Sequence, residues 1–109
     1  MATMTLDKQQ STYVLNLTNG NQENALNKAV LEEYFAIFDE IESDKNNACL
    51  IIRSDHPKTF CNGLDLAWLM QQSLEDKKAF TLQLENMLLR LALLNLPVVA
   101  EIGGNAYAG

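Results

Sequence analysis

The amino-acid sequence predicts an α/β fold in which parallel strands are joined by helical crossovers. The first observation is a short, continuous apolar run from Ala48 to Arg53, the pattern of a strand that is covered on both faces of a parallel sheet. The second is a helical stripe of apolar residues between Leu26 and Ile41. The third is the stretch from Thr59 to Leu66, where a glycine turn follows a strand and leads into another helical pattern. Helical connections of this length join parallel strands in a right-handed sense.

The length and composition indicate a single globular domain. The chain has 109 residues, of which 48% are apolar and 20% are charged, and this balance supports a hydrophobic core. The net charge of −6 argues against nucleic-acid binding, which requires a basic surface. We therefore expect no nucleic-acid partner.

The sequence also bears on the compartment and on membrane contact. Cys49 and Cys61 lie far apart without the spacing of a metal site, which fits a reducing compartment. Residues 1–10 lack the charged and apolar regions of a secretory signal. The apolar stretch from Leu82 to Leu96 contains too many polar residues to span a membrane. We expect a soluble, cytoplasmic protein with no membrane partner.

The first half of the chain predicts a strand followed by a helix. Tyr13 to Thr18 alternates between apolar and polar residues, as a half-buried strand does, and Asn19-Gly20-Asn21 supplies a turn. Asn24 is a plausible N-cap for the helix that follows. This helix is expected to end near Ser43-Asp44, and its buried stripe consists of Leu26, Val30, Tyr34, Ile37, Phe38 and Ile41.

The second half predicts two helices and a further strand. A short helix extends to about Gln72, and a longer one covers Glu75 to Leu96. From Leu82 onward the longer helix is apolar almost all round, which predicts burial between layers or against another subunit. Pro97 is expected to end it, because the residue before a proline is pushed out of the helical region. Val98 to Ile102 then forms a strand that leads into a glycine-rich loop.

The chain stops at Gly109, inside that glycine-rich loop. A domain is not expected to end between a strand and the helix that follows it. We therefore expect residues 1–109 to be the first part of a longer domain, truncated after Gly109.

The two glycine turns are the candidate functional site. Both follow parallel strands, and in α/β sheets ligands bind beyond the carboxyl ends of such strands. The stretch from Thr59 to Leu66 places backbone N–H groups at a helix start, which favours an anion. Two converging N–H donors would form an oxyanion hole for a thioester enolate. Nucleotide binding and a purely structural role remain alternatives. Gly104 to Gly109 has the glycine spacing of the first half of a phosphate-binding loop, whose Lys-Ser or Lys-Thr would come after Gly109.

Side chains near these turns offer weaker candidates. His56 lies in a polar loop, and no triad partner has a suggestive spacing. Cys61 could act as a nucleophile beside a helix start, but no base accompanies it. Asp65 in the first helical turn favours capping of free N–H groups over catalysis. The basic residues that could bind an anion, and are otherwise solvated surface charges, are Lys28, Arg53 and Lys58.

Three motifs resemble the crotonase superfamily, the enoyl-CoA hydratases and isomerases. Phe60-Cys61-Asn62-Gly63-Leu64-Asp65-Leu66 resembles the signature F-x-x-G-x-D-L. Asn24-Ala25-Leu26-Asn27 resembles the N-A-L turn, and the stretch from Pro97 to Gly109 resembles P-V-I-A-x-I-x-G-x-A-x-G-G. The resemblance implies an α/β, crotonase-like (ClpP/crotonase) fold, of which residues 1–109 are the N-terminal part of one domain. The variant N-G-L-D-L-A-W is closer to the Δ3,Δ2-enoyl-CoA isomerases than to typical hydratases.

The resemblance also implies roles for individual residues. The backbone N–H of Leu64 would be the first oxyanion-hole donor, and the second would be Gly109 or a residue just past it. The backbone of the N-A-L turn would contact the adenine end of coenzyme A. The residues implied in binding the acyl-CoA are Asn24, Ala25, Leu26, Asn62, Gly63, Leu64, Asp65 and Leu66.

For the full-length protein, the resemblance implies an enoyl-CoA hydratase or isomerase of fatty-acid metabolism. Catalytic carboxylates would follow the second glycine turn. Coenzyme A is part of the substrate, so no separate cofactor and no metal are expected. A homotrimer or a hexamer is the expected assembly. The alternative is a non-catalytic or truncated relative that binds acyl-CoA without chemistry.

Overall fold

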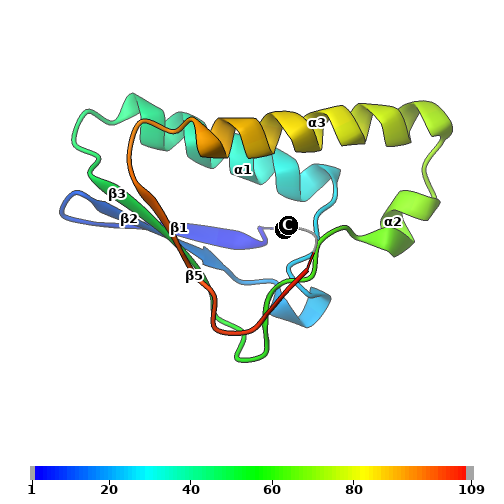
Figure 1. Ribbon diagram of the computed structural model, residues 1–109, viewed down its shortest axis with the longest axis horizontal. Helices are drawn as coiled ribbons and strands as arrows, with labels where there is room; N and C mark the ends of the chain where they lie inside the picture. Colours follow the sequence, from blue (N-terminus) through cyan, green and yellow to red (C-terminus); the bar gives the residue numbers. More distant parts are fainter. Residues whose placement is uncertain (1, 108–109) are drawn as a thin grey trace.

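The computed structural model describes residues 2–107. A four-stranded sheet lies beneath two long helices, α1 and α3 (Figure 1). The elements in chain order are β1 (Met4–Gln9), β2 (Thr12–Leu17), the 3-10 helix η1 (Gly20–Gln22), α1 (Lys28–Ser43), β3 (Cys49–Ser54), β4 (Thr59–Cys61), α2 (Leu66–Met70), α3 (Leu74–Ala92), β5 (Val98–Glu101) and β6 (Asn105–Ala106).

The main sheet has the strand order β1-β2-β3-β5, and β4 pairs with β6 in a second sheet. The pairs β2–β3 and β3–β5 are parallel, with Leu50 opposite both Tyr13 and Val98. The predicted parallel strands and helical crossovers are therefore confirmed. Strands β1, β4 and β6 were not predicted. The β1–β2 hairpin is hard to predict because its turn, Gln10-Ser11, lacks the glycine that usually marks a tight hairpin turn. Gln10 instead adopts the positive φ, 58°, that such turns require.

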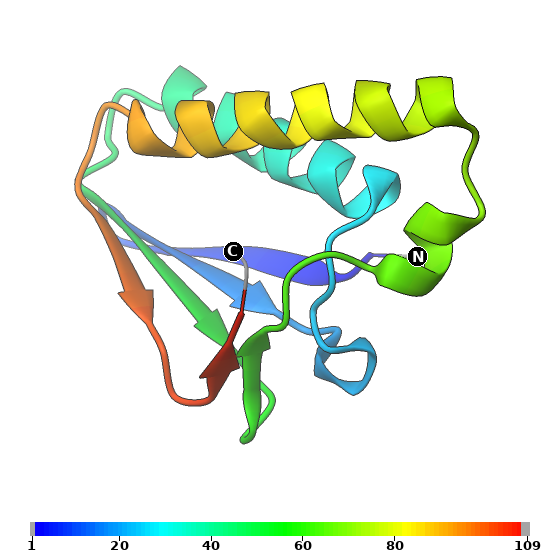
Figure 2. The same cartoon turned by 45° about the vertical axis from the view of Figure 1, so that its right-hand side comes forward.

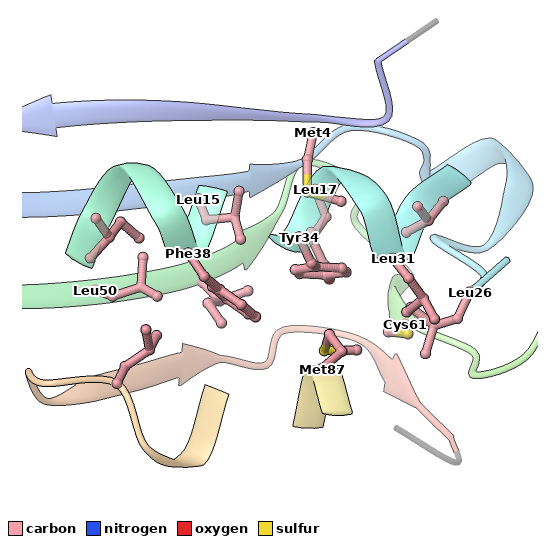
Figure 3. Packing of buried hydrophobic residues seen from close by; sticks show 14 of the residues in the cluster. Met4, Leu15, Leu17, Leu26, Leu31, Tyr34, Phe38, Leu50, Cys61 and Met87 are labelled. Atoms are coloured by element: carbon pink, nitrogen blue, oxygen red, sulfur yellow. The ribbon is translucent and has the colours of Figure 1, made fainter. Parts of the chain in front are cut away.

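The core lies between the sheet and the two helices. Figure 3 shows Tyr34 and Phe38 of α1 among Leu15 and Leu17 of the sheet and Met87 of α3. In β3, Leu50 and Ile52 are buried toward this core, whereas the alternate residues are only half-buried. The expectation that β3 is fully covered on both faces is therefore wrong for this chain, because both long helices lie on one side of the sheet.

Helix α1 begins later than the sequence suggested. Its N-cap is Asn27, whose side-chain oxygen accepts the N–H of Val30 at 3.0 Å. Asn24 is not a cap, because it lies in a left-handed turn with a φ of 48°. Four members of the predicted apolar stripe are confirmed as buried in the helix: Val30, Tyr34, Phe38 and Ile41. Ile37 is only partly buried, Leu26 is buried but precedes the helix, and the buried Leu31 was not predicted.

Helix α3 is shorter and more exposed than predicted. It ends at Ala92 instead of Leu96, and Leu93 caps it by donating its N–H to the Leu89 carbonyl at 3.0 Å. Pro97 therefore does not end the helix; its carbonyl instead accepts the N–H of Leu50 at 2.9 Å. One face of α3 packs on the core through Phe80 and Met87. Leucines on the opposite face are exposed, so this chain covers only one side of the helix.

None of the helices within residues 2–107 is both long and apolar enough to cross a lipid bilayer.

Candidate functional site

The two glycine segments meet beyond the carboxyl ends of the main-sheet strands. Figure 2 shows β4 and β6 beside each other, with the arrowheads of β3 and β5 directed toward them. The N–H of Asn105 donates to the Lys58 carbonyl at 2.9 Å, and the N–H of Tyr107 donates to the Cys61 carbonyl at 2.8 Å. The described part of the second glycine segment is thus a strand on β4, which argues against a phosphate-binding loop there.

Gly104 permits this close approach. A Cβ at Gly104 would lie 2.5 Å from the Lys58 carbonyl carbon, a distance that no side chain could tolerate. Gly109, the predicted second oxyanion donor, lies outside the described residues.

A single β-bridge between Leu26 and Leu64 organises the first glycine turn. The N–H of Leu26 donates to the Gly63 carbonyl at 2.7 Å, and the Leu26 carbonyl accepts the N–H of Asp65 at 2.9 Å. In a parallel bridge, the residue on one strand bonds to the residues before and after its opposite number, and not to that residue itself. The N–H of Leu64, which lies opposite Leu26, therefore points away from the 24–27 turn. In residues 2–107 it has no hydrogen-bond acceptor. Gly63, with a φ of 82°, provides the left-handed conformation that the turn requires.

Asp65 serves as the N-cap of α2. One carboxylate oxygen accepts the N–H of Trp68 at 3.1 Å, and the other accepts the side-chain amide of Asn27 at 3.4 Å. The predicted capping role is confirmed, with the helix beginning at Leu66. Because Asn27 caps α1, this contact joins the starts of the two helices.

An open groove of about 360 Å³ runs along the turn. Five of its lining residues were predicted to contact acyl-CoA: Ala25, Asn62, Leu64, Asp65 and Leu66. Sequence reasoning missed the remainder, which are Asn21, Gln22, Glu23 and Ala67. The Asn19-Gly20-Asn21 turn was recognised, but nothing local to it indicated that η1 lies against the segment that follows β4.

The other predicted contact residues do not line the groove. Asn24 and Leu26 are buried, so their side chains face the interior of the protein, and Gly63 is buried as well. The three basic candidates for anion binding also lie elsewhere, and Arg53 approaches Glu101 with 3.7 Å between Nε and Oε2.

Cys61 lies in β4 rather than at a helix start, so a helix does not activate its thiol, which argues against the weaker candidacy of Cys61 as a nucleophile. Its thiol donates to the Asn24 carbonyl at 3.4 Å and accepts the Gly63 N–H at 3.5 Å. Burial raises the pKa of the Cys61 thiol, an effect that the Gly63 N–H opposes. A raised pKa disfavours the thiolate, so Cys61 is poorly suited to act as a nucleophile.

His56 is half-buried in the loop before β4. Its Nδ1 accepts the N–H of Lys58 at 3.2 Å, and its side chain packs on Gly20, where a Cβ would lie 2.2 Å from the His56 Cβ. The histidine is therefore occupied in shaping the loop. Over the described part of the chain, no cluster of His, Cys, Asp or Glu could hold a metal ion.

Comparison with known sequences identifies relatives over almost all of the chain. The family model described as Enoyl-CoA hydratase/isomerase matches residues 7–109. The mitochondrial methylglutaconyl-CoA hydratase of Mus musculus is 29% identical over 103 residues, which cover 94% of this chain and 33% of that protein. The short-chain-enoyl-CoA hydratase of Clostridium acetobutylicum is 28% identical over 104 residues, which cover 95% of this chain and 40% of that protein. The chain thus spans about a third to two fifths of the length of these relatives.

Solved structures show the same arrangement of elements. An enoyl-CoA hydratase from Bacillus anthracis superposes with a TM-score of 0.89 at 25% identity, over 94% of this chain and 40% of that one. Pseudomonas aeruginosa DspI gives a TM-score of 0.87 at 16% identity, over 95% of this chain and 42% of that one. At that identity the likeness concerns the fold alone. The predicted crotonase-like α/β fold is confirmed. The chain belongs to the enoyl-CoA hydratase/isomerase family of the crotonase superfamily.

Proposed function

We propose that the full-length protein acts on acyl-CoA thioesters and that the N–H of Leu64 is the first donor of its oxyanion hole. The observation that carries this proposal is the Leu26–Leu64 bridge. It holds the main chain on either side of Leu64 and leaves the Leu64 N–H without an acceptor in residues 2–107, in a residue that lines the groove.

The chemistry follows from the charge that develops on a thioester. Its carbonyl oxygen becomes negative when the α-carbon loses a proton or when water attacks the β-carbon of an enoyl group. A fixed N–H at about 2.7–3.1 Å from that oxygen stabilises the charge without reorganising during the reaction. Gly109 is the proposed second donor. The pairing of β6 with β4 supports it, because this pairing holds Asn105 and Ala106 beside the strand that leads to Leu64.

The groove is the proposed site for the thioester and the pantetheine arm. Ala25, Asn62 and Leu66 are the proposed contacts, together with Leu64 and Asp65. Since Asn24 and Leu26 are buried, any contact they make with coenzyme A would have to come from backbone atoms. In this proposal coenzyme A is part of the substrate, and no separate cofactor takes part.

The reaction is proposed to be hydration of a 2-enoyl-CoA or migration of the double bond of a 3-enoyl-CoA, in fatty-acid metabolism. Both kinds of protein occur among the relatives, since the chain is also 25% identical to enoyl-CoA delta isomerase 3 of Arabidopsis thaliana. A carboxylate outside residues 2–107 would move the proton in either reaction.

The test is to incubate the full-length protein with 2-enoyl-CoA and with 3-enoyl-CoA and to follow both products. Turnover of either substrate is expected. Binding of crotonyl-CoA without any turnover would overturn the enzymatic proposal and leave a non-catalytic acyl-CoA-binding protein. If crotonyl-CoA neither binds nor is turned over, the proposal that the protein acts on acyl-CoA thioesters is overturned.

A homotrimer or hexamer is the proposed assembly. The exposed leucines on the outer face of α3 support it, because apolar side chains gathered on one helix face favour burial against a partner.

A further inference from the structure

We propose that Asn24 is a positioning residue, whose buried side-chain amide fixes the direction of the Leu64 N–H. This inference rests on the proposed oxyanion role of Leu64. It assigns the Asn24 side chain to contacts within the protein and not with coenzyme A.

The amide of Asn24 connects the ends of β2 and β3 with β4. Its oxygen accepts the N–H of Asn19, just after β2, at 2.9 Å. Its nitrogen donates to the hydroxyl of Ser54, the last residue of β3, at 3.0 Å, and to the carbonyl of Phe60 in β4 at 2.8 Å. The residue is only 6% exposed, so water cannot readily replace these partners. The contact with Phe60 is the costly one to disturb, because it is buried and the Phe60 carbonyl would lose this hydrogen bond away from water.

A short chain of contacts continues from Asn24 to Leu64. The Asn24 carbonyl accepts the Cys61 thiol at 3.4 Å, and the same sulfur accepts the N–H of Gly63 at 3.5 Å. The peptide group that joins Gly63 to Leu64 contains the proposed donor N–H. The Gly63 N–H itself belongs to the preceding peptide, which joins Asn62 to Gly63, and the carbonyl of the donor peptide accepts the Leu26 N–H. Asn24 therefore acts on the donor peptide through the neighbouring peptide, whose position depends on where Asn24 holds Phe60 and Cys61.

The backbone of the 23–26 turn reinforces this dependence. Glu23 and Asn24 both adopt left-handed conformations, with φ values of 63° and 48°, and the Glu23 carbonyl accepts the N–H of Asn62 at 3.0 Å. Asparagine tolerates such a conformation better than most residues do, because its side chain can form local hydrogen bonds. Asn24 thus both permits the shape of the turn and anchors the turn to β4.

Precise placement matters because an oxyanion donor works only if it is held in position before charge develops. In Asn24→Ala the anchor to Phe60 is lost, and the 60–64 segment can shift relative to the turn. We expect kcat of the full-length protein to fall by about 10- to 100-fold, as misplacements near 1 Å do in other enzymes, with a smaller change in KM.

Asn47→Ala is the matched control. Asn47 also donates its side-chain amide to a main-chain carbonyl, that of Ile41 at 2.8 Å, but it precedes β3 and so lies at the opposite end of the strands. This variant should lose stability as Asn24→Ala does, while kcat stays within about twofold of the wild type because the donor is undisturbed. Both variants are assayed well below their melting temperatures.

Asn24→Asp provides a second, pH-dependent readout. At neutral pH its ionised carboxylate cannot donate to the Phe60 carbonyl, so kcat should be low. As the pH falls and the carboxyl becomes protonated, its O–H can donate to that carbonyl, and kcat should rise relative to the wild type. If the ratio of variant to wild-type kcat does not depend on pH, the proposed contact is not what positions the donor.

If Asn24→Ala does not fold, Cys61 provides an independent test of the same chain of contacts. Cys61→Ala removes the contact with Gly63 and should lower kcat, whereas Cys61→Ser can form both hydrogen bonds and should restore it. Wild-type kcat in Cys61→Ala would overturn the inference.

The two proposals can fail separately. Full activity in Asn24→Ala, together with an inactive Leu64→Pro, would overturn the inference and leave the proposed function standing. An active Leu64→Pro would overturn the oxyanion assignment itself. If crotonyl-CoA binds without turnover, the shift of the Leu64 amide resonance on binding tests the same geometry. That shift should be smaller in Asn24→Ala and unchanged in Asn47→Ala, and equal shifts in all three proteins would overturn the inference.

Discussion

Leu26 holds the main chain on both sides of Leu64, donating to the Gly63 carbonyl at 2.7 Å and accepting from the Asp65 N–H at 2.9 Å. The two residues are far apart in sequence and form an isolated parallel bridge. This arrangement leaves the Leu64 N–H without an acceptor in residues 2–107, in a turn whose neighbouring peptides are engaged, and it underlies the proposed chemistry.

Leu64→Pro removes that N–H, and it should abolish most of the activity of the full-length protein. The bridge itself does not use the Leu64 N–H, so the fold should survive. Loss of one oxyanion donor typically lowers kcat by about 10²–10³-fold. Leu64→Ala is the control, because it keeps the N–H and should retain far more activity. Steady-state kinetics with an enoyl-CoA substrate measure both variants, and equal activities would contradict the assignment.

Asp65→Ala should destabilise the fold by about 1 kcal/mol, the usual cost of losing an N-cap. The variant loses the contact with the Trp68 N–H at 3.1 Å and the link to Asn27 at 3.4 Å. Asp65→Asn keeps a capping oxygen and should recover most of this loss. Urea denaturation followed by circular dichroism gives the free energies of unfolding. Indistinguishable midpoints for the wild type and Asp65→Ala would show that the cap contributes little.

Stability should decline at both extremes of pH because of the cluster of Asp44, Lys8 and Tyr13. Hydrogen bonds from Lys8 and then Tyr13 lower the pKa of Asp44 from 3.8 to about 2. A lowered pKa means that this contribution is present above pH 3.8 and is lost as the pH falls toward 2. The hydrogen bond to Asp44, aided by burial, raises the pKa of Tyr13 from 10.0 to about 12, so its contribution is lost as the pH rises through that range.

Denaturation at a series of pH values checks both halves of this prediction. Asp44→Asn should flatten the dependence of unfolding free energy on pH between about 4 and 2, because it removes the group with the lowered pKa. Tyr13→Phe should flatten the dependence between about 10 and 12. Curves parallel to the wild type in both variants would mean that other groups dominate the pH dependence.

Leu89→Glu should weaken the proposed trimer or hexamer. Leu89 is 58% exposed on the outer face of α3, near the exposed Leu82 and Leu93. A charge in a buried apolar interface is strongly unfavourable, so the variant should show a lower mass by light scattering. Met70→Glu is the control, because Met70 is 78% exposed on α2, away from this face. A monomeric wild-type protein would contradict the assembly.

Local sequence patterns determined much of the architecture. The period of apolar residues predicted α1, with its buried Val30, Tyr34 and Phe38, and the apolar runs predicted β3 and β5 as parallel strands. The position of Asp65 predicted its capping role. Each of these features depends on residues within a few positions of one another, so periodicity and capping chemistry are sufficient to find them. The three motifs predicted the family, because the resemblance rests on short segments in a set order.

Contacts between distant segments were decided only by the tertiary structure. Asn24 is of a residue type that is common at N-caps, yet its side-chain amide is buried against Ser54 and Phe60. No local sequence pattern could reveal these contacts. Helix α3 is apolar on two faces. Only the packing shows that the face with Phe80 and Met87 is the one that is buried in this chain. Among residues 2–107 the Leu64 N–H has no acceptor because Leu26, far away in sequence, bonds instead to the Gly63 carbonyl and the Asp65 N–H. The sequence by itself therefore determined the helices, the parallel strands of the main sheet and the family, whereas the geometry of the site depends on hydrogen bonds that form only when those elements come together.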